Sequence, residues 1–540
     1  MDKIIKILTD KVDDSIQSFE QFPKENEFLN LYNATMLFIE HVKKGSRILL
    51  IHDSDADGCG CYMISHIYFT KYFPGLNVEL IITDRSKGYG FRPYHITDRE
   101  NQLPDLIITS DNGITSHDAC DLARSKGIDV IITDHHQVDM FKGLPNANFI
   151  VDPHQDACTF PYPDINGSFV YWYFIDHFHR MMGGEGNLFY EFLPELCLTT
   201  ISDVMPLKHI NRYVVKEGLK LFNTANLHHR QWVRSFHETK KGETITAEDL
   251  GFNLIPSINV AARLSNAEEA AIFLTRENRA DSLEYLAYLR ELNDTRKAKQ
   301  QQLMMSIEND YSSWLEHPFI LIPGEKFTKG LLGPVSGRLA EHHKCPAIVL
   351  TKSADGLTYS GSGRSIGEIN ILDIIKHNPF IIQDKTGGHK AACGVSFKVD
   401  DLIPFWQRLQ EDIKKVPKEQ YVETTKKSLG LFNLNAMSLD LYYELEKFAP
   451  FGKDFERPIF ESYAEVTSAV KMGKDKNHYN IKFKTEEGVE IRAVWFFFND
   501  TIKRKTKIRF KYNIMLDTFS KDEVKFVLHI KEVMEKEKLW

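Results

Sequence analysis

The chain has 540 residues, of which 42% are hydrophobic and 26% are charged. At about 150 residues per domain, this length indicates a globular protein of three or four domains. No segment approaches the roughly 20 consecutive apolar residues of a membrane-spanning helix, and the first residues lack the apolar stretch of a secretory signal. We therefore expect a cytoplasmic protein with no membrane partner. The net charge of -8 excludes a chain that is basic throughout, but not a single basic face.

Four short apolar runs between residues 47 and 135 predict a mostly parallel sheet that is buried on both faces, and hence an α/β fold. The runs are 47–52, 78–83, 105–110 and 129–133. Acidic residues and two histidines follow three of these runs, at the carboxyl ends where an open α/β sheet places its ligands. We expect them to form one site: Asp53, Asp55, Asp57, Asp111, Asp134, His135 and His136.

The remaining segments predict a multi-domain chain. Residues 160–280 have mainly helical patterns, and the stretch 281–310 has no Gly or Pro and repeats Leu at every third position, which predicts one long helix. A second α/β region follows, and beyond residue 455 short strand-like runs predict a small β barrel. The expected boundaries are 1–280 for the first α/β domain, 281–316 for the connecting helix, 317–427 for the second α/β domain and 428–540 for the barrel.

The motif DSDADG at 53–58 places three carboxylates two residues apart. Their mutual repulsion costs free energy that divalent cations would offset. Mg²⁺ and Mn²⁺ prefer oxygen ligands, and Mn²⁺ also accepts imidazole, which the residues at the other strand ends supply. The motif alone is also typical of a solvated loop or a calcium site. The matching acidic residues after the other strands favour a catalytic metal centre.

Nine motifs occur in one order along residues 45–500. They are DSDADG (53–58), SDNG (110–113), DHH (134–136), SDVMPL (202–207), IPSINVAAR (255–263), LNDTRK (292–297), GSGRS (361–365), GGHKAACG (387–394) and PFGKDFERPIF (450–460). In these motifs the chain resembles the DHH phosphoesterases, and within them the RecJ-type single-strand exonucleases. The resemblance implies a DHH catalytic lobe, a DHH-associated lobe and an OB-like barrel. It also implies hydrolysis of single-stranded DNA from the 5′ end, in repair or recombination.

The resemblance further implies a site for two ions, Mn²⁺ or Mg²⁺. The residues that would hold the first ion are Asp57, Asp111, His135 and Asp203. Those that would hold the second are Asp53, Asp55 and again Asp111. Asp134 is expected to orient an imidazole, and His136 to contact the phosphate, the alternative for His136 being a buried, hydrogen-bonded histidine.

A further set of residues resembles the family's substrate-binding positions: Arg85, Tyr89, Asn259, Arg263, Ser362, Arg364, Gly387, Gly388 and His389. The three arginines with Ser362 would take a 5′-phosphate end, and the alternative for each is a surface salt bridge. Tyr89 would stack on a terminal base or cap the sheet edge. The backbone at Gly387, Gly388 and His389 would approach the strand or form a tight turn.

Residues 471–531 hold 15 Lys and Arg against 8 Asp and Glu, interleaved with aromatic residues. Basic strands with aromatics are typical of a barrel that grips single-stranded nucleic acid by charge and base stacking. About half of the aromatics should be core, because alternate positions of a strand are buried. We therefore expect single-stranded DNA with a 5′-phosphorylated end as partner. A single-strand-binding protein or a helicase is the candidate protein partner.

Two other functions compete with the exonuclease. One is a phosphodiesterase for short oligonucleotides or cyclic dinucleotides, which would need neither a barrel nor a long connecting helix. The other is a non-catalytic replication scaffold, in which the metal motifs would be degenerate. Here every carboxylate and the first histidine are present, which favours the exonuclease.

Overall fold

The computed structural model describes residues 2–139, 142–224, 230–240, 243–421, 428–473, 476–485, 487–496, 498, 501–517 and 525–538. The chain forms two units. Asp14–Val422 is the α/β unit, and Met1–Asp13 together with Glu423–Trp540 is the barrel unit. Across the described ranges, none of the helices has both the length and the apolar character that crossing a bilayer requires.

The α/β unit begins with a five-stranded sheet in the order β2-β1-β3-β4-β5, in which every neighbouring pair is parallel. Its strands are β1 (Ile48–His52), β2 (Val78–Ile82), β3 (Leu106–Ser110), β4 (Asp129–Thr133) and β5 (Phe149–Val151). The four strands predicted from the apolar runs are confirmed. The fifth was not predicted, because three residues are too few to give a recognisable pattern.

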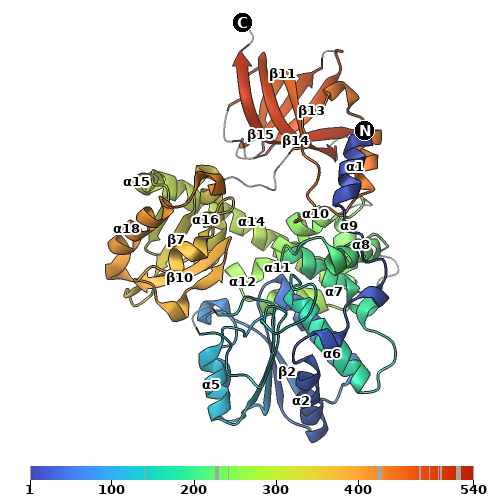
Figure 1. Ribbon diagram of the computed structural model, residues 1–540, viewed down its shortest axis with the longest axis vertical. Helices are drawn as coiled ribbons and strands as arrows, with labels where there is room; N and C mark the ends of the chain where they lie inside the picture. The colour runs from blue at the N-terminus through green and yellow to red at the C-terminus, as the bar shows by residue number, and fades with distance from the viewer. Residues whose placement is uncertain are drawn as a thin grey trace. The chain divides into compact units, whose positions relative to one another are not determined.

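Helices cover both faces of this sheet. Figure 1 shows α5 (His117–Ser125) on one side and α2 (Leu31–Lys44) and α6 (Gly167–Met181) on the other. Leu49 and Ile51 of β1 belong to the apolar cluster on the α5 side, while the alternate β1 residues are equally buried. Burial on both faces explains the absence of polar alternation in the strands. It leaves the carboxyl ends of the strands as the place for polar side chains.

A mainly helical region follows the sheet, as predicted. Its elements are α7 (Phe189–Ser202), α8 (His209–Asn223), α9 (Gln231–Thr239), α10 (Ala247–Asp249), the π-helical turn η5 (Leu250–Leu254), α11 (Ile255–Asn259), α12 (Ala261–Leu264) and α13 (Glu268–Thr275). Two further helices lie within the sheet region: α3 (Ala56–Tyr72) and α4 (Tyr94–Thr97). The 32-residue helix α14 (Arg279–Asp310) then confirms the predicted connecting helix. The Asn278 side chain caps α14 by accepting from the backbone N of Ala280 at 2.8 Å.

The second sheet of the α/β unit has the order β6-β7-β8-β10-β9, with only the first pair parallel. Its strands are β6 (Ile320–Gly324), β7 (Ala347–Lys352), β8 (Thr358–Arg364), β9 (Gly387–His389) and β10 (Ala392–Lys398), and its helices are α15 (Ser312–Leu315), α16 (Lys329–His343), α17 (Ile371–Lys376) and α18 (Leu402–Ile413). The segment GSGRS thus ends a strand. A Cβ atom at Gly361 would lie 2.6 Å from the carbonyl oxygen of Val349, so close packing on β7 requires the glycine.

The barrel unit is a closed barrel in the order β11-β12-β13-β15-β14, as predicted. Its strands are β11 (Phe460–Met472), β12 (His478–Lys484), β13 (Glu490–Trp495), β14 (Thr506–Leu516) and β15 (Phe526–Lys538), and its helices are α1 (Asp2–Lys11) and α19 (Leu439–Glu446). Figure 1 shows α1, in blue, beside the barrel. Ile4 and Leu8 of α1 share an apolar cluster with Leu441 and Leu445 of α19. Residues 1–13 therefore belong with the barrel, which corrects the predicted boundary of 1–280 for the first α/β domain.

Candidate functional site

The first part of the site is the turn between β1 and α3. Asp53 is buried at the start of this turn and accepts from the Thr83 hydroxyl at 2.9 Å. Asp55 is the N-cap of α3 and accepts from the backbone N of Asp57 at 3.1 Å and of Gly58 at 3.3 Å. A Cβ atom at Gly58 would lie 2.1 Å from the carbonyl oxygen of Asp53. The glycine of the DSDADG motif is therefore required by the turn that gathers the three carboxylates.

The Asp57 carboxylate faces the N-terminus of α6. It accepts from the backbone N of Gly167 at 2.7 Å and of Ser168 at 2.9 Å, and from Nδ2 of Asn166 at 3.1 Å. Burial and the Asp203 carboxylate raise its pKa well above the usual range, while these donors favour the ionised form. Sequence reasoning missed these three residues. The available signal was Asn166, a favourable N-cap at the start of an apolar helix.

Asp111 follows β3 and is 2% exposed. Its φ of 60° is rare for a residue other than glycine, which marks a locally strained backbone. A Cβ atom at Gly167 would lie 2.5 Å from its Oδ1 atom, so α6 approaches this carboxylate as closely as a glycine allows. Burial and the Asp57 carboxylate raise the pKa of Asp111 well above its usual range.

His135 follows β4, and its Nε2 atom points at three carboxylates. The distances are 3.2 Å to Oδ1 of Asp111, 3.5 Å to Oδ2 of Asp203 and 3.9 Å to Oδ2 of Asp57. Burial lowers the pKa of His135 to about 3, which keeps the imidazole neutral. A neutral imidazole can offer a ring nitrogen to a cation.

The six predicted metal ligands come together in two groups. Asp57, His135 and Asp203 form one, and Asp53, Asp55 and Asp111 form the other, each with ligand atoms within 4.8 Å of one another. Asp111 Oδ1 and His135 Nε2 are buried and lack a hydrogen-bond partner in the part of the chain that the structure describes. Buried polar atoms without partners are costly, and a cation would satisfy both. Five carboxylates with one imidazole are a donor set that suits Mn²⁺ or Mg²⁺.

Asp134 orients the DHH segment instead of lying at the centre. Its Oδ1 accepts from Nδ1 of His136 and from the backbone N of His135, both at 2.8 Å, and its Oδ2 accepts from the backbone N of Ile114 at 2.9 Å. Burial disfavours the charged forms of both His136 and Asp134, but the attraction between the two side chains outweighs it. The pKa of His136 is therefore raised to about 10, and the pKa of Asp134 is lowered to about 2. The side chain of His136 is 41% exposed, so this site holds an accessible imidazolium.

Three predicted substrate-binding residues lie around these carboxylates. Arg85 donates from Nε to Oγ of Ser54 at 2.7 Å, and its Nη2 lies 3.1 Å from Oδ2 of Asp55. Tyr89 is 38% exposed, and its hydroxyl lies 3.2 Å from Nε2 of His136. Asn259 accepts from the backbone N of Ala56 at 2.7 Å. The structure thus gives Asn259 a positioning contact at the first turn of α3.

Arg263, Ser362 and Arg364 gather at the start of α16. Arg263 donates to the carbonyl oxygen of Gly330 at 3.4 Å, and Arg364 donates to Oγ of Ser362 at 2.9 Å. Burial, and then the positive charges of Arg85 and other arginines, lower the pKa of Arg263 to about 10. One of those arginines is Arg296 on α14, which sequence reasoning did not select although it lies in the LNDTRK motif.

Gly387, Gly388 and His389 form the exposed strand β9 at the edge of the second sheet. Gly388 has a φ of +144°, and a Cβ atom there would lie 2.3 Å from the carbonyl oxygen of Ala392. The glycine is therefore required by the pairing with β10 itself. The role of β9 in strand binding stays a prediction.

The barrel sorts its aromatic residues into core and surface. Tyr479, Phe483 and Trp495 are buried in its core, whereas Phe496 is 41% exposed and Phe497 lies outside the described residues. Tyr463 on β11 is 46% exposed, and the cations of Lys507 and Arg509 lie 6.0 Å and 5.7 Å from its ring centroid. Exposed aromatics beside cations provide the stacking and charge that single strands need.

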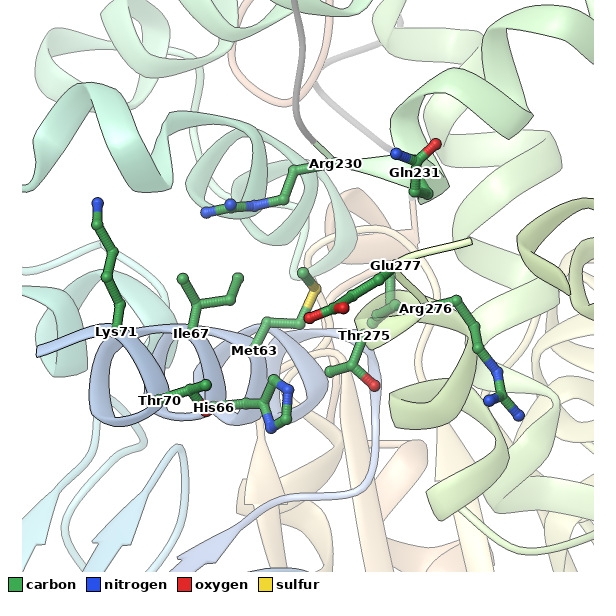
Figure 2. A pocket seen from close by; sticks show the side chains of 11 residues that line it. Met63, His66, Ile67, Thr70, Lys71, Arg230, Gln231, Thr275, Arg276 and Glu277 are labelled. Carbon is green, nitrogen blue, oxygen red and sulfur yellow. The ribbon is translucent and has the colours of Figure 1, made fainter. Parts of the chain in front are cut away.

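A separate cavity of about 290 Å³ lies along the C-terminal half of α3, away from the carboxylates at its N-terminus. Figure 2 shows Lys71 and Arg230 on this cavity. Lys71 pairs with Glu191 and Arg230 with Glu195, each at 2.8 Å. Two of its basic side chains are thus engaged in ion pairs, and its lining includes none of the six predicted metal ligands.

Comparisons with known proteins agree with this architecture. Three family models match: "DHH family, N-terminal domain" over residues 47–200, "DHHA1 domain" over 316–415 and "RecJ OB domain" over 430–532. A relative from Escherichia coli (strain K12), named single-stranded-DNA-specific exonuclease RecJ, is 28% identical over 465 residues, which cover 82% of this chain and 78% of the relative.

Solved structures with the same fold include two of RecJ from Thermus thermophilus. Its complex with Mn²⁺ has a TM-score of 0.76 at 22% identity, covering 95% of this chain and 72% of that one. Its complex with Mg²⁺ has a TM-score of 0.70 at 21% identity, covering 94% and 71%. Along the sequence, this chain therefore matches a DHH-family N-terminal domain, then a DHHA1 domain and then a RecJ OB domain.

Proposed function

We propose that this protein is a metal-dependent exonuclease that hydrolyses single-stranded DNA from the 5′ end, in repair or recombination. The observation that carries the proposal is the convergence of five carboxylates and His135, two of whose buried atoms, Asp111 Oδ1 and His135 Nε2, lack hydrogen-bond partners among the described residues. The relatives named as single-stranded-DNA-specific exonucleases support the substrate. A complete set of ligands also argues against a non-catalytic scaffold.

The proposed cofactor is a pair of Mn²⁺ or Mg²⁺ ions, held by the two ligand groups described above. When bound, two such ions polarise a phosphodiester and lower the pKa of an attacking water. The chain itself supplies the imidazolium of His136, whose proton the Asp134 carboxylate stabilises. A charged donor at this position would bind a non-bridging phosphate oxygen and stabilise the charge that develops during hydrolysis.

The arginines would recognise the 5′ end of the DNA strand. Arg263 and Arg364 donate to neutral oxygen acceptors, which leaves their positive charge for an anion. We assign them, with Arg85 and Ser362, to the 5′-terminal phosphate. Tyr89 would stack on the terminal base, and β9 would contact the strand backbone. A single-strand-binding protein or helicase as partner, and a cytoplasmic location, remain predictions.

Strands labelled at the 5′ or 3′ end, incubated with and without Mn²⁺, test the proposal. The expected result is Mn²⁺-dependent release of mononucleotides from the 5′ end, with the 3′-labelled strand shortening in steps. Release from the 3′ end would refute the polarity. Cleavage of dinucleotides alone would indicate the short-substrate phosphodiesterase, and strand binding without cleavage would indicate the scaffold.

A further inference from the structure

Two arginines from different parts of the α/β unit meet the first turns of α16. Arg263 on α12 donates to the carbonyl oxygen of Gly330 at 3.4 Å. Arg364 on β8 comes so close that a Cβ atom at Gly333 would lie 2.9 Å from its Nη2 atom. These glycines leave room for both arginines on one surface of the helix.

A third arginine reaches the same turns from the connecting helix. Arg296 on α14 donates from Nη1 to Oε1 of Gln300 at 3.1 Å and from Nε to Oδ1 of Asn293 at 3.0 Å. Gln300 in turn donates to the carbonyl oxygen of Pro334 in α16 at 3.3 Å. The Gln300 amide thus links the Arg296 guanidinium to α16. The positive charge of Arg296 is also among the causes that lower the pKa of Arg263.

All three guanidiniums donate to neutral oxygen atoms. Within the described part of the chain, none of them forms an ion pair with a carboxylate, whereas Arg85 pairs with Asp55 at 3.1 Å. Burial lowers the pKa of each. Partly buried cations without counter-charges raise the free energy of the fold, and a bound anion would lower it.

We infer that Arg296 is a phosphate-binding residue of the 5′-end site, and that a phosphate bound there ties the connecting helix to the lobes on either side of it. The inference rests on the proposed function and extends it. Arg263 precedes α14 in the chain, Arg296 lies on it and Arg364 follows it. A terminal phosphate carries up to two negative charges near neutral pH and several acceptor oxygens, so it can bind more than one guanidinium fork. Its binding would stabilise the arrangement of all three segments.

Calorimetric titration of the full-length chain with inorganic phosphate, without metal or DNA, tests the inference. We expect phosphate affinity to fall at least tenfold in Arg296→Gln. Arg296→Lys keeps the charge but loses the planar fork, and should bind with intermediate affinity. Arg290→Gln is the matched control, because Arg290 lies on the same helix, is also partly buried and donates to a neutral acceptor, Oγ1 of Thr239, at 2.8 Å. This control should bind phosphate as the wild type does.

Hydrogen exchange of the wild type supplies a second readout. Added phosphate should slow exchange in residues 255–264, 293–300 and 329–337 together. Unchanged phosphate affinity in both Arg296 variants, absence of phosphate binding to the wild type, or protection confined to one lobe would each overturn the inference. A wild type that binds phosphate in this way yet cuts no DNA would instead refute the proposed function, so the two failures are distinguishable.

Discussion

The Nε2 atom of His135 lies 3.2 Å from Oδ1 of Asp111, and neither buried atom has a hydrogen-bond partner within the described ranges. Burial keeps the imidazole neutral and raises the pKa of the carboxyl. Buried polar atoms without partners are costly, and a cation would coordinate both of them. Their relationship therefore predicts how the site responds to substitution.

Asp111→Asn and His135→Ala should each abolish Mn²⁺-dependent cleavage and weaken Mn²⁺ binding, because each removes a ligand from the group that converges on these atoms. Titration with Mn²⁺ followed calorimetrically measures the loss directly, with strand binding in the absence of metal expected to persist. Asp118→Asn, at an exposed carboxylate on α5, is the control and should titrate like the wild type. Normal turnover in either ligand variant would contradict the two-ion assignment.

Gly167→Ala should disable the site without touching a ligand. The added Cβ atom would lie 2.5 Å from Oδ1 of Asp111, so the carboxylate or the start of α6 must shift. Overpacking of this kind costs about 1 to 3 kcal/mol. Mn²⁺ affinity should fall while the circular dichroism spectrum stays native. Gly75→Ala, where a Cβ atom meets nothing within 4 Å, is the matched control. Equal Mn²⁺ affinity in both variants would show that Asp111 tolerates displacement.

Much of the fold is predictable because burial leaves a local mark. The consecutive apolar residues of β1 to β4 predict buried strands, and the Gly-free stretch of α14 predicts a long helix. The sequence of the N-terminal helix α1, by contrast, does not indicate which surface the helix packs against. Ile4 and Leu8 define an apolar face, but any apolar surface would suit that face, and only the folded chain places it on the barrel.

The metal ligands could be predicted because strand ends converge by topology, so neighbouring motifs in an α/β sheet imply neighbouring side chains. The residues that hold these ligands could not. Asn166 and Gly167 meet Asp57 across more than 100 residues of sequence, through a helix terminus that no local pattern connects to the strand ends. Arg296 could not be predicted as a substrate-binding residue for a similar reason. Its link to α16 depends on the Gln300 side chain and on the course of the long helix α14.

Asn259 is expected to act through α3. Its side-chain oxygen accepts from the backbone N of Ala56, between the ligands Asp55 and Asp57. Asn259→Leu should remove this bond, cost about 1 kcal/mol and weaken Mn²⁺ binding, because the first turn of α3 loses its anchor. Asn259→Asp keeps an acceptor and should retain most of the affinity. If both variants bind Mn²⁺ normally but lose affinity for DNA, Asn259 contacts the substrate and does not position the turn.

The barrel should lose stability in acid through His529. Burial, with nearby cations, lowers the pKa of this histidine from 6.5 to about 4. A depressed pKa means that the folded state binds the proton less readily than the unfolded chain does. The contribution is therefore fully present above about pH 6.5 and is lost as pH falls toward 4. Thermal unfolding of His529→Gln should vary less between pH 7 and pH 4.5 than that of the wild type. His342→Gln, at an exposed position, is the control. Equal pH dependence in all three proteins would contradict this role.

Separating the two units should separate cleavage of short strands from tight binding of long strands. A chain of residues 14–422 keeps all six proposed metal ligands and the three arginines at α16, so it should still cut short strands. Because this chain lacks the basic barrel, its affinity for long strands should fall. The affinity should also depend less on salt, since each lost phosphate contact makes the slope of log affinity against log salt shallower by about 0.7. Removing 428–540 alone is a poorer design, because it uncovers Ile4 and Leu8 of α1. Binding assays over a series of salt concentrations measure the slope. Equal slopes for the full chain and for residues 14–422 would show that the α/β unit makes the electrostatic contacts with the strand.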